Sequence, residues 1–131
     1  LALPGKQQKP EREDSEWKPT MALINLGTND IAREMPTREQ FIGAYRGLID
    51  DIRSDAPKAE IFCVFGPMIN EKKHGTIRDC LDTIAAGEDR IHVVRLRNEH
   101  GLQGVGTHWH PNVRSHRSMA DQLLKAIQAT R

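Results

Sequence analysis

Three short apolar runs, separated by longer stretches of helical periodicity, constrain the fold of this chain more than any other feature. The runs span residues 21–26, 61–65 and 91–96. Each is short and mostly apolar, which is typical of strands covered on both faces. The order strand, helix, strand, helix, strand, helix predicts an α/β fold with a parallel sheet and right-handed crossovers.

The helices are predicted from apolar residues that recur at helical spacing. Thr37 followed by Gln40 is a capping-box signature at the start of the first helix, and Asn112 is a suitable N-cap for the last. The residues expected to face the core are Phe41, Ile42, Tyr45, Leu48, Ile49 and Ile52 in the first helix, Ile77, Cys80, Leu81, Ile84 and Ala85 in the second, and Val113, Met119, Ala120, Leu123, Leu124 and Ile127 in the third.

Composition argues against two classes of partner. The 131 residues include 19 basic and 18 acidic side chains, so the overall charge gives no electrostatic case for binding nucleic acid or an anionic membrane. No apolar run approaches the roughly 20 residues that a membrane helix needs. Residues 1–19 are polar, contain three prolines and are predicted to form a surface arm or loop, whereas residues 20–131 are predicted to belong to one domain.

The two cysteines are too few for a disulfide scaffold. Cys63 lies in the second apolar run, and Cys80 lies on the apolar face of the second predicted helix. Both are therefore expected to be buried free thiols, and a bridge between them is the alternative.

In parallel sheets, functional sites form beyond the carboxyl ends of the strands. Three loops are predicted there, at residues 27–30, 66–70 and 97–110, and they place Asn29 and His110 on the same edge. A histidine delivered on a loop is a candidate general base. An asparagine amide on a tight loop is a candidate hydrogen-bond donor to an oxyanion, although Asn29 could instead be a turn residue.

Several aromatic and imidazole side chains surround His110 in the sequence. Trp109 either packs in the core or forms the wall of a sugar or acyl site. His108 and His110, with His100 and His116, form the alternative of a zinc site, because His-x-His is a metal-ligand spacing. No aspartate follows to complete a hydrolase metal motif, so no metal is predicted. His116, one turn into the last helix, is expected to be packed and hydrogen-bonded.

Four motifs, in this order and spacing, resemble the SGNH (GDSL-like) hydrolase superfamily. They are Trp17-Lys18-Pro19, Ile24-Asn25-Leu26-Gly27-Thr28-Asn29-Asp30, Gly66-Pro67-Met68 and Trp109-His110-Pro111-Asn112, with His116 six residues after His110. From about Trp17 onward, the chain looks most like the acetyl (xylan) esterases of carbohydrate esterase family 2. The resemblance implies a three-layer, flavodoxin-like fold with five parallel strands, of which this chain would supply about three strands and three helices.

The resemblance also implies a serine esterase, without a cofactor, that acts on acetylated carbohydrates or other small esters. Carried over by position, His110 would be the general base and Asn29 an oxyanion donor. Trp109, His108 and Gly27 would line the substrate site. A secreted or periplasmic location would fit such a protein.

The chain departs from the family pattern at the nucleophile. The family's serine block precedes the Gly-x-Asn-Asp block, but none of the serines here, at positions 15, 54, 115 and 118, follows a strand in that context. The chain is therefore expected to be the C-terminal part of such an enzyme, with an N-terminal companion segment or chain, or a homo-oligomer, at its exposed first strand. A non-catalytic carbohydrate-binding module of the same fold is the alternative.

A second departure concerns the residue that orients His110. Family members often place an aspartate two or three residues before the catalytic histidine, where this chain has His108 and Thr107. The sequence therefore predicts a Ser–His dyad, in which a main-chain carbonyl of residues 107–109 accepts a hydrogen bond from His110 Nδ1. Glu99 is the nearest preceding acid and the alternative partner.

Overall fold

The computed structural model of the chain describes residues 18–29, 36–67, 71–97, 101 and 104–130. The arm predicted for residues 1–19 therefore lies almost entirely outside the described residues, as do Asp30, Glu99 and His100. No helix among the described residues is long and apolar enough to cross a membrane.

Three strands form a single sheet in the order β1-β2-β3. They are β1 (Met21–Ile24), β2 (Glu60–Phe65) and β3 (Ile91–Arg95). Both pairings are parallel, with Met21 beside Glu60 and Ile61 beside Ile91. The parallel sheet predicted from the three apolar runs is confirmed, and its central strand is the predicted run 61–65 with one residue added.

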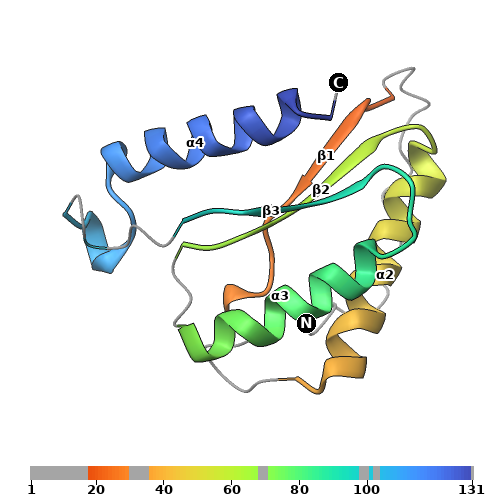
Figure 1. Cartoon of the computed structure of the whole chain (residues 1–131), viewed down its shortest axis with the longest axis horizontal. Coiled ribbons are helices and arrows are strands. Elements are labelled where there is room, and N and C mark those ends of the chain that lie inside the picture. Colours follow the sequence, from red (N-terminus) through yellow and green to blue (C-terminus); the bar gives the residue numbers. More distant parts are fainter. Residues whose placement is uncertain (1–17, 30–35, 68–70, 98–100, 102–103, 131) are drawn as a thin grey trace, which may run out of the picture.

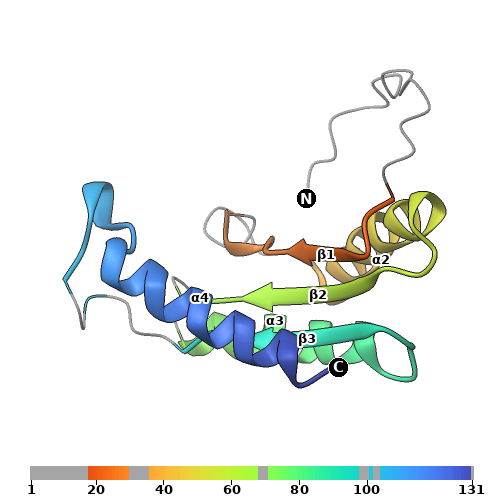
Figure 2. The same ribbon diagram turned by 90° about the horizontal axis from the view of Figure 1, so that it is seen from above.

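The helices complete three layers. They are α2 (Arg38–Asp55), α3 (Glu71–Ala85) and α4 (Val113–Gln128). The predicted capping box at the start of α2 is present, because the Thr37 hydroxyl accepts from the Gln40 main-chain N–H and the Gln40 side chain accepts from the Thr37 N–H. α2 and α3 cover one face of the sheet and α4 covers the other, which confirms the three-layer α/β fold (Figure 1, Figure 2).

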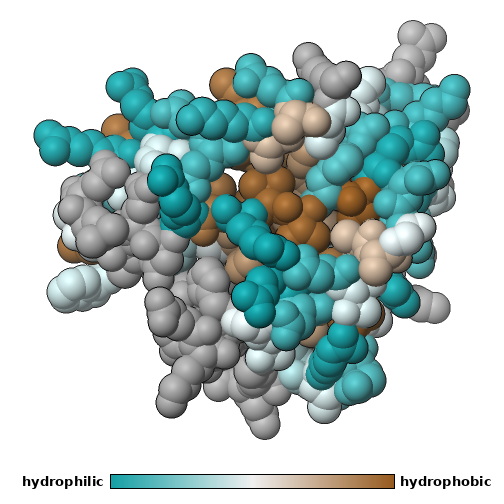
Figure 3. All heavy atoms as spheres, viewed as in Figure 1, coloured by the Kyte–Doolittle hydropathy of each residue, from teal (hydrophilic) through white to brown (hydrophobic). Residues whose placement is uncertain are grey.

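Each face of the sheet buries its own apolar cluster, because successive side chains of a strand point to opposite faces. On the α2–α3 face the cluster includes Ile24, Phe41, Tyr45, Ile49, Ile61, Cys63, Phe65, Ile77, Cys80, Leu81, Ile84 and Ile91. On the α4 face, Phe62, Val64, Val94 and Leu96 pack against Met119, Leu123, Ala126 and Ile127. In Figure 3 apolar atoms show as a band between the hydrophilic outer surfaces of the helices.

Part of the inward face predicted for α4 is wrong. Val113 is 82% exposed, Leu124 is 53% exposed, and Ala120 is exposed as well. At about 100° per residue these three lie on the flank of α4 opposite Gln122, whose side-chain oxygen accepts from the main chain just past β3.

This flank of α4 therefore points away from β3, toward β1. No described element covers that part of the sheet, and Leu23 of β1 is 51% exposed on the same face. We refer to Leu23, Val113, Ala120 and Leu124 as the apolar flank.

The polar groups in the larger cluster are structural. Cys63 and Cys80 are buried free thiols, as predicted, and burial raises the pKa of both. Tyr45 is fully buried, its hydroxyl donates to the Ile24 carbonyl at 3.4 Å, and burial strongly raises the pKa of the phenol. All three groups stay protonated near neutral pH and contribute no charge to the core.

Candidate functional site

Gly27 makes the turn that carries Asn29 out of β1. Its φ of 110° lies in the left-handed region that favours glycine, and a Cβ at this position would lie 3.1 Å from the Phe41 ring. Thr28 and Asn29 then begin a helical turn in which Asn29 is exposed. The side-chain amide of Asn29 makes no hydrogen bond to another described residue, so it can donate to a ligand.

The ends of β2 and β3 are held against each other. Gly66 follows β2 with a φ of 101°, and a Cβ there would lie 2.8 Å from the carbonyl oxygen of Leu96. The Leu96 N–H donates to the Phe65 carbonyl at 3.0 Å. This close approach requires glycine at position 66 and fixes where the chain leaves β3 on its way toward His110.

The loop at residues 104–112 holds the main chain of His110 from both sides. The Gly106 N–H donates to the His110 carbonyl at 2.7 Å, and the His110 N–H donates to the Thr107 carbonyl at 3.1 Å. An antiparallel bridge between Val105 and Pro111 closes the loop. His110 is exposed while its backbone is tied in place, which suits a side chain that exchanges protons with a ligand.

The turn Thr107–Trp109 contains two non-glycine residues in the left-handed region. His108 has a φ of 51° and Trp109 a φ of 63°. Such a backbone costs a non-glycine residue on the order of 1–2 kcal/mol, so the surrounding loop holds these residues against their local preference. Trp109 is 73% exposed, so the alternative of a packed core tryptophan is wrong. Its indole is presented to solvent between His108 and His110.

Asn112 begins α4 directly after this loop and is the predicted N-cap. Its side-chain oxygen accepts from the Ser115 N–H at 3.0 Å and from the Ser115 hydroxyl at 3.3 Å. The expectation that His116 is packed is wrong, because the residue is exposed. The first turn of α4 extends past the end of the sheet, where no described layer covers it (Figure 1).

The structure places Asn29 and His110 on the same edge of the sheet, as predicted. Both turns lie beyond the carboxyl ends of the strands (Figure 2). No hydrogen bond between described residues joins Asn29 to His110, and no described carboxylate pairs with the His110 ring. Glu99, the alternative partner, lies outside the described residues. The catalytic roles of Asn29 and His110 stay predictions.

The described residues offer no metal centre. They contain no group of three His, Cys, Asp or Glu side chains that could hold an ion. His108, His110 and His116 are all described, so the zinc alternative would depend on His100, which is not.

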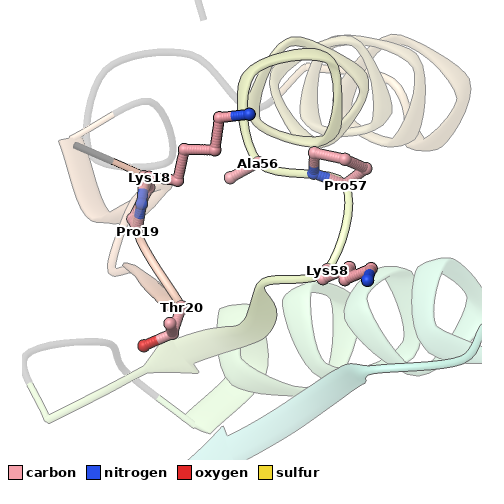
Figure 4. A pocket seen from close by; sticks show the side chains of 6 residues that line it. All are labelled: Lys18, Pro19, Thr20, Ala56, Pro57 and Lys58. Carbon is pink, nitrogen blue, oxygen red and sulfur yellow. The ribbon is translucent and has the colours of Figure 1, made fainter. Parts of the chain in front are cut away.

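A hollow of about 360 Å³ lies at the opposite end of the sheet from His110. Figure 4 shows its lining, Lys18, Pro19, Thr20, Ala56, Pro57 and Lys58. These residues precede β1 and β2, so the hollow belongs to the amino edge. It was not predicted, because no motif marks residues that meet only through strand pairing.

Arg114 and Arg117 are exposed on the first two turns of α4. Between Asp89 and Asp121 the sequence contains five arginines, five histidines and one acid, Glu99.

Comparison with known proteins settles the family. The model of the GDSL-like lipase/acylhydrolase family matches residues 3–118, which is most of the chain. The chain belongs to this family. The predicted resemblance to SGNH (GDSL-like) hydrolases is thereby confirmed.

Relatives of this GDSL-like chain include named esterases. The chain is 31% identical over 119 residues to the cellulase/esterase CelE of Acetivibrio thermocellus, a match that covers 87% of this chain and 15% of that protein. It is 23% identical over 124 residues to an acetylxylan esterase / glucomannan deacetylase of Cellvibrio japonicus, covering 86% of this chain and 33% of that protein.

Among solved structures, the chain matches a family two carbohydrate esterase from Clostridium thermocellum in complex with cellohexaose. The TM-score is 0.77 at 30% identity, over 87% of this chain and 37% of that one. The chain thus spans between 15% and 37% of the length of these relatives.

Proposed function

We propose that this chain forms the C-terminal part of the catalytic domain of a serine esterase that removes acetyl groups from carbohydrates. The observation that carries the proposal is the presence of Asn29 and His110 at the carboxyl edge of one parallel sheet, in a chain of the GDSL-like hydrolase family. The names of the relatives, a cellulase/esterase and an acetylxylan esterase, support both the ester and the carbohydrate.

In the proposed acylation step His110 is the general base. Its unprotonated ring nitrogen takes the hydroxyl proton of the serine while the serine oxygen attacks the acetyl carbonyl carbon. The side-chain amide of Asn29 donates a hydrogen bond to the negative oxygen of the tetrahedral intermediate. When the intermediate collapses, the bond from the carbonyl carbon to the sugar oxygen breaks, and His110 returns the proton to that oxygen.

Deacylation repeats the sequence with water. His110 takes one proton from the water as the water oxygen bonds to the acyl carbon, and Asn29 again stabilises the oxyanion. When the intermediate collapses, the bond from the acyl carbon to the serine oxygen breaks, His110 returns its proton to that oxygen, and acetic acid leaves. In this scheme His108 and Trp109 line the substrate side of the site. Gly27 acts through the backbone, because it shapes the turn that carries Asn29.

The nucleophilic serine of this proposal lies outside the 131 residues. Ser115 is buried, and the Ser118 hydroxyl accepts from the Gln122 side chain at 3.3 Å. Ser54 lies in the last turn of α2, which leads to the amino end of β2, far from the carboxyl edge. Ser15 lies outside the described residues.

We infer that an N-terminal companion segment carries this serine and docks on β1. Among the described residues β1 is paired only with β2, so its other edge presents unpaired main-chain groups. The apolar flank lies beside that edge. A companion could add a strand parallel to β1, which would pair the free edge, and a helix that covers the apolar flank. The alternative is a homo-oligomer, which a measurement of the mass of the protein in solution would reveal.

For the orientation of His110 we propose a neutral acceptor. A main-chain carbonyl of residues 107–109 would hold Nδ1–H so that Nε2 faces the serine. Such a carbonyl holds the tautomer but stabilises the imidazolium less than a carboxylate does. A crystal structure of the full-length protein tests this, since a carboxylate from Glu99 or another acid within hydrogen-bonding distance of Nδ1 would restore a triad.

Turnover of an acetylated oligosaccharide by the full-length protein tests the function itself. His110→Ala should abolish acetate release, whereas His108→Ala should reduce the rate of acetate release far less. A serine-directed phosphonate should inhibit the protein and label one serine, which mass spectrometry would locate. If His110→Ala turned over substrate at the wild-type rate, His110 would not be the general base.

The exposed indole of Trp109 favours one second candidate, a carbohydrate-binding module without catalysis. This alternative predicts that the full-length protein binds cello-oligosaccharides, that Trp109→Ala weakens the binding, and that no acetate appears. Phosphonate labelling distinguishes the two candidates without depending on the choice of substrate.

A further inference from the structure

The turn that carries Asn29 rests with its inner side on α2. The Asn29 side chain is exposed and makes no hydrogen bond to another described residue, so the main chain of the turn decides where its amide lies. In Figure 1 the chain bends after β1 toward the layer formed by α2 and α3. Within the turn Gly27 is buried, whereas Asn25 and Leu26 before it are exposed. Gly27 is therefore the point at which the turn meets the core.

The ring of Phe41, on α2, lies directly against Gly27. A Cβ on Gly27 would be 3.1 Å from Cε2 and 3.3 Å from Cζ of this ring, whereas the nearest atom of Ile77 would be 3.8 Å away. Phe41 is only 4% exposed and belongs to the apolar cluster between the sheet and the layer of α2 and α3. Close packing in that cluster fixes the ring, so the ring is a firm support for the turn.

Tyr45, one helical turn further along α2, holds the other end of the same segment. The ring centroids of Phe41 and Tyr45 are 5.6 Å apart, at an interplanar angle of 34°. The Tyr45 hydroxyl donates to the carbonyl of Ile24, the last residue of β1, at 3.4 Å. A bond of that length is weak, so the fully buried Tyr45 contributes mainly through packing. The two aromatic side chains thus support the chain at the end of β1 and again at Gly27, two residues before Asn29.

We propose that Phe41 is a positioning residue for Asn29, because its ring supports Gly27 where the Asn29 amide can meet the oxyanion. This inference rests on the proposed esterase function and adds a buried residue that acts through another. An oxyanion donor is effective when its position is set before the reaction, and a misplacement on the order of 1 Å costs about a hundredfold in rate. A smaller side chain at position 41 would leave a space under Gly27 into which the turn can settle.

The variant Phe41→Leu tests the proposal in the full-length protein. Leucine keeps the position apolar but removes the ring on which Gly27 rests. With an acetylated xylo-oligosaccharide, kcat for acetate release should fall by roughly ten- to a hundredfold while KM stays unchanged, since the contact with the oxyanion exists only in the transition state. Tyr45→Phe removes only the weak hydrogen bond and should lower kcat less than Phe41→Leu does.

Phe62→Leu is the matched control. It makes the same change in a fully buried side chain on the other face of the sheet, under α4. Urea unfolding should show a loss of stability similar to that of Phe41→Leu, whereas kcat should stay at the wild-type value. An unchanged kcat in Phe41→Leu, or an equal loss of kcat in the two variants, would overturn the inference.

A double-variant cycle shows whether Phe41 acts through Asn29. Asn29→Ala already lacks the donor, so the addition of Phe41→Leu to it should lower kcat no further. If Phe41 served stability alone, Phe41→Leu would lower kcat by the same factor with and without the Asn29 amide. That result would reduce Phe41 to an ordinary core residue.

Crystal structures of the full-length variants provide a readout that needs no turnover. In Phe41→Leu the Asn29 turn should be displaced toward α2 by on the order of 1 Å, the misplacement that the loss of rate requires. In Phe62→Leu the turn should keep its wild-type position. A wild type that releases no acetate would remove the proposed function, and the displacement would still decide whether the ring holds the turn. An undisplaced turn in Phe41→Leu would contradict the assignment.

Discussion

Replacement of Asn112 by alanine probes the junction between the His110 loop and α4. The Asn112 side chain accepts two hydrogen bonds, from the main-chain N–H and the hydroxyl of Ser115. Alanine removes the oxygen that accepts both bonds and adds no bulk. The change should therefore weaken the start of the helix and release the loop that fixes His110.

The expected cost follows from these two contacts. Loss of an N-cap side chain costs about 1 kcal/mol. The Ser115 hydroxyl, on a residue only 3% exposed, would also lose its acceptor, which adds about 1 kcal/mol or more. The unfolding free energy should therefore fall by about 2 kcal/mol, and for a domain of this size the melting temperature should fall by roughly 6–8 °C.

Two matched variants make the measurement specific. Asn112→Asp keeps an acceptor and adds a negative charge at a helix N-terminus, where it is favourable, so its stability should equal or exceed the wild type. Thr37→Ala removes the corresponding cap of α2, on the other face of the sheet, at a cost of about 1 kcal/mol. Urea unfolding followed by circular dichroism measures stability, and acetate release by the full-length protein measures activity.

Comparison of the three variants decides whether the Asn112 cap holds the His110 loop in place. Asn112→Ala should lower both stability and kcat, whereas Thr37→Ala should lower stability alone. If Asn112→Asp is as unstable as Asn112→Ala, the hydrogen-bond argument is refuted. If both alanine variants lower kcat to the same extent, the cap of α4 has no special part in holding His110.

Three further outcomes are expected. Asn29→Ala should lower kcat of the full-length protein by about a hundred- to a thousandfold with stability unchanged, since the residue is exposed and one oxyanion donor is lost; an unaltered kcat would leave it a turn residue. Leu81→Ala should lower the unfolding free energy by about 2–5 kcal/mol, whereas Leu124→Ala, at a half-exposed position, should lower that of the isolated chain far less. Similar decreases in the two variants would contradict the burial of α3. Cys63 and Cys80 should resist iodoacetamide at about pH 8 until the chain unfolds, because burial raises the pKa of both thiols. Rapid labelling of the native chain would contradict their burial. Because burial raises the pKa of both thiols, the unfolding free energy should also fall as the pH rises above about 8.5, where only the unfolded thiols release their protons.

Local sequence determined the elements of this protein and most of their boundaries. The strands follow from short apolar runs, and the start of α2 follows from the side chains of Thr37 and Gln40, which bond to main-chain groups three residues away. Asn112 marks the start of α4 in the same way. These signals act within one turn of chain, so they can be read without knowing the fold.

The parallel order of the elements also predicted that Asn29 and His110 share an edge of the sheet. That inference needed only the direction of the strands, because every loop after a parallel strand emerges on the same side. It did not predict the hydrogen bonds that tie the His110 backbone, which form between groups of the loop itself once it is closed.

Tertiary structure alone decided which apolar residues are covered. Val113 and Leu124 continue the apolar face of α4 in the sequence, yet they lie on the flank that points toward β1 and away from the other layers. Trp109 is likewise exposed, because the loop holds it in a left-handed turn beyond the sheet. Periodicity tells which side of a helix is apolar, but burial depends on whether another element lies opposite that side, and for the apolar flank no described element does.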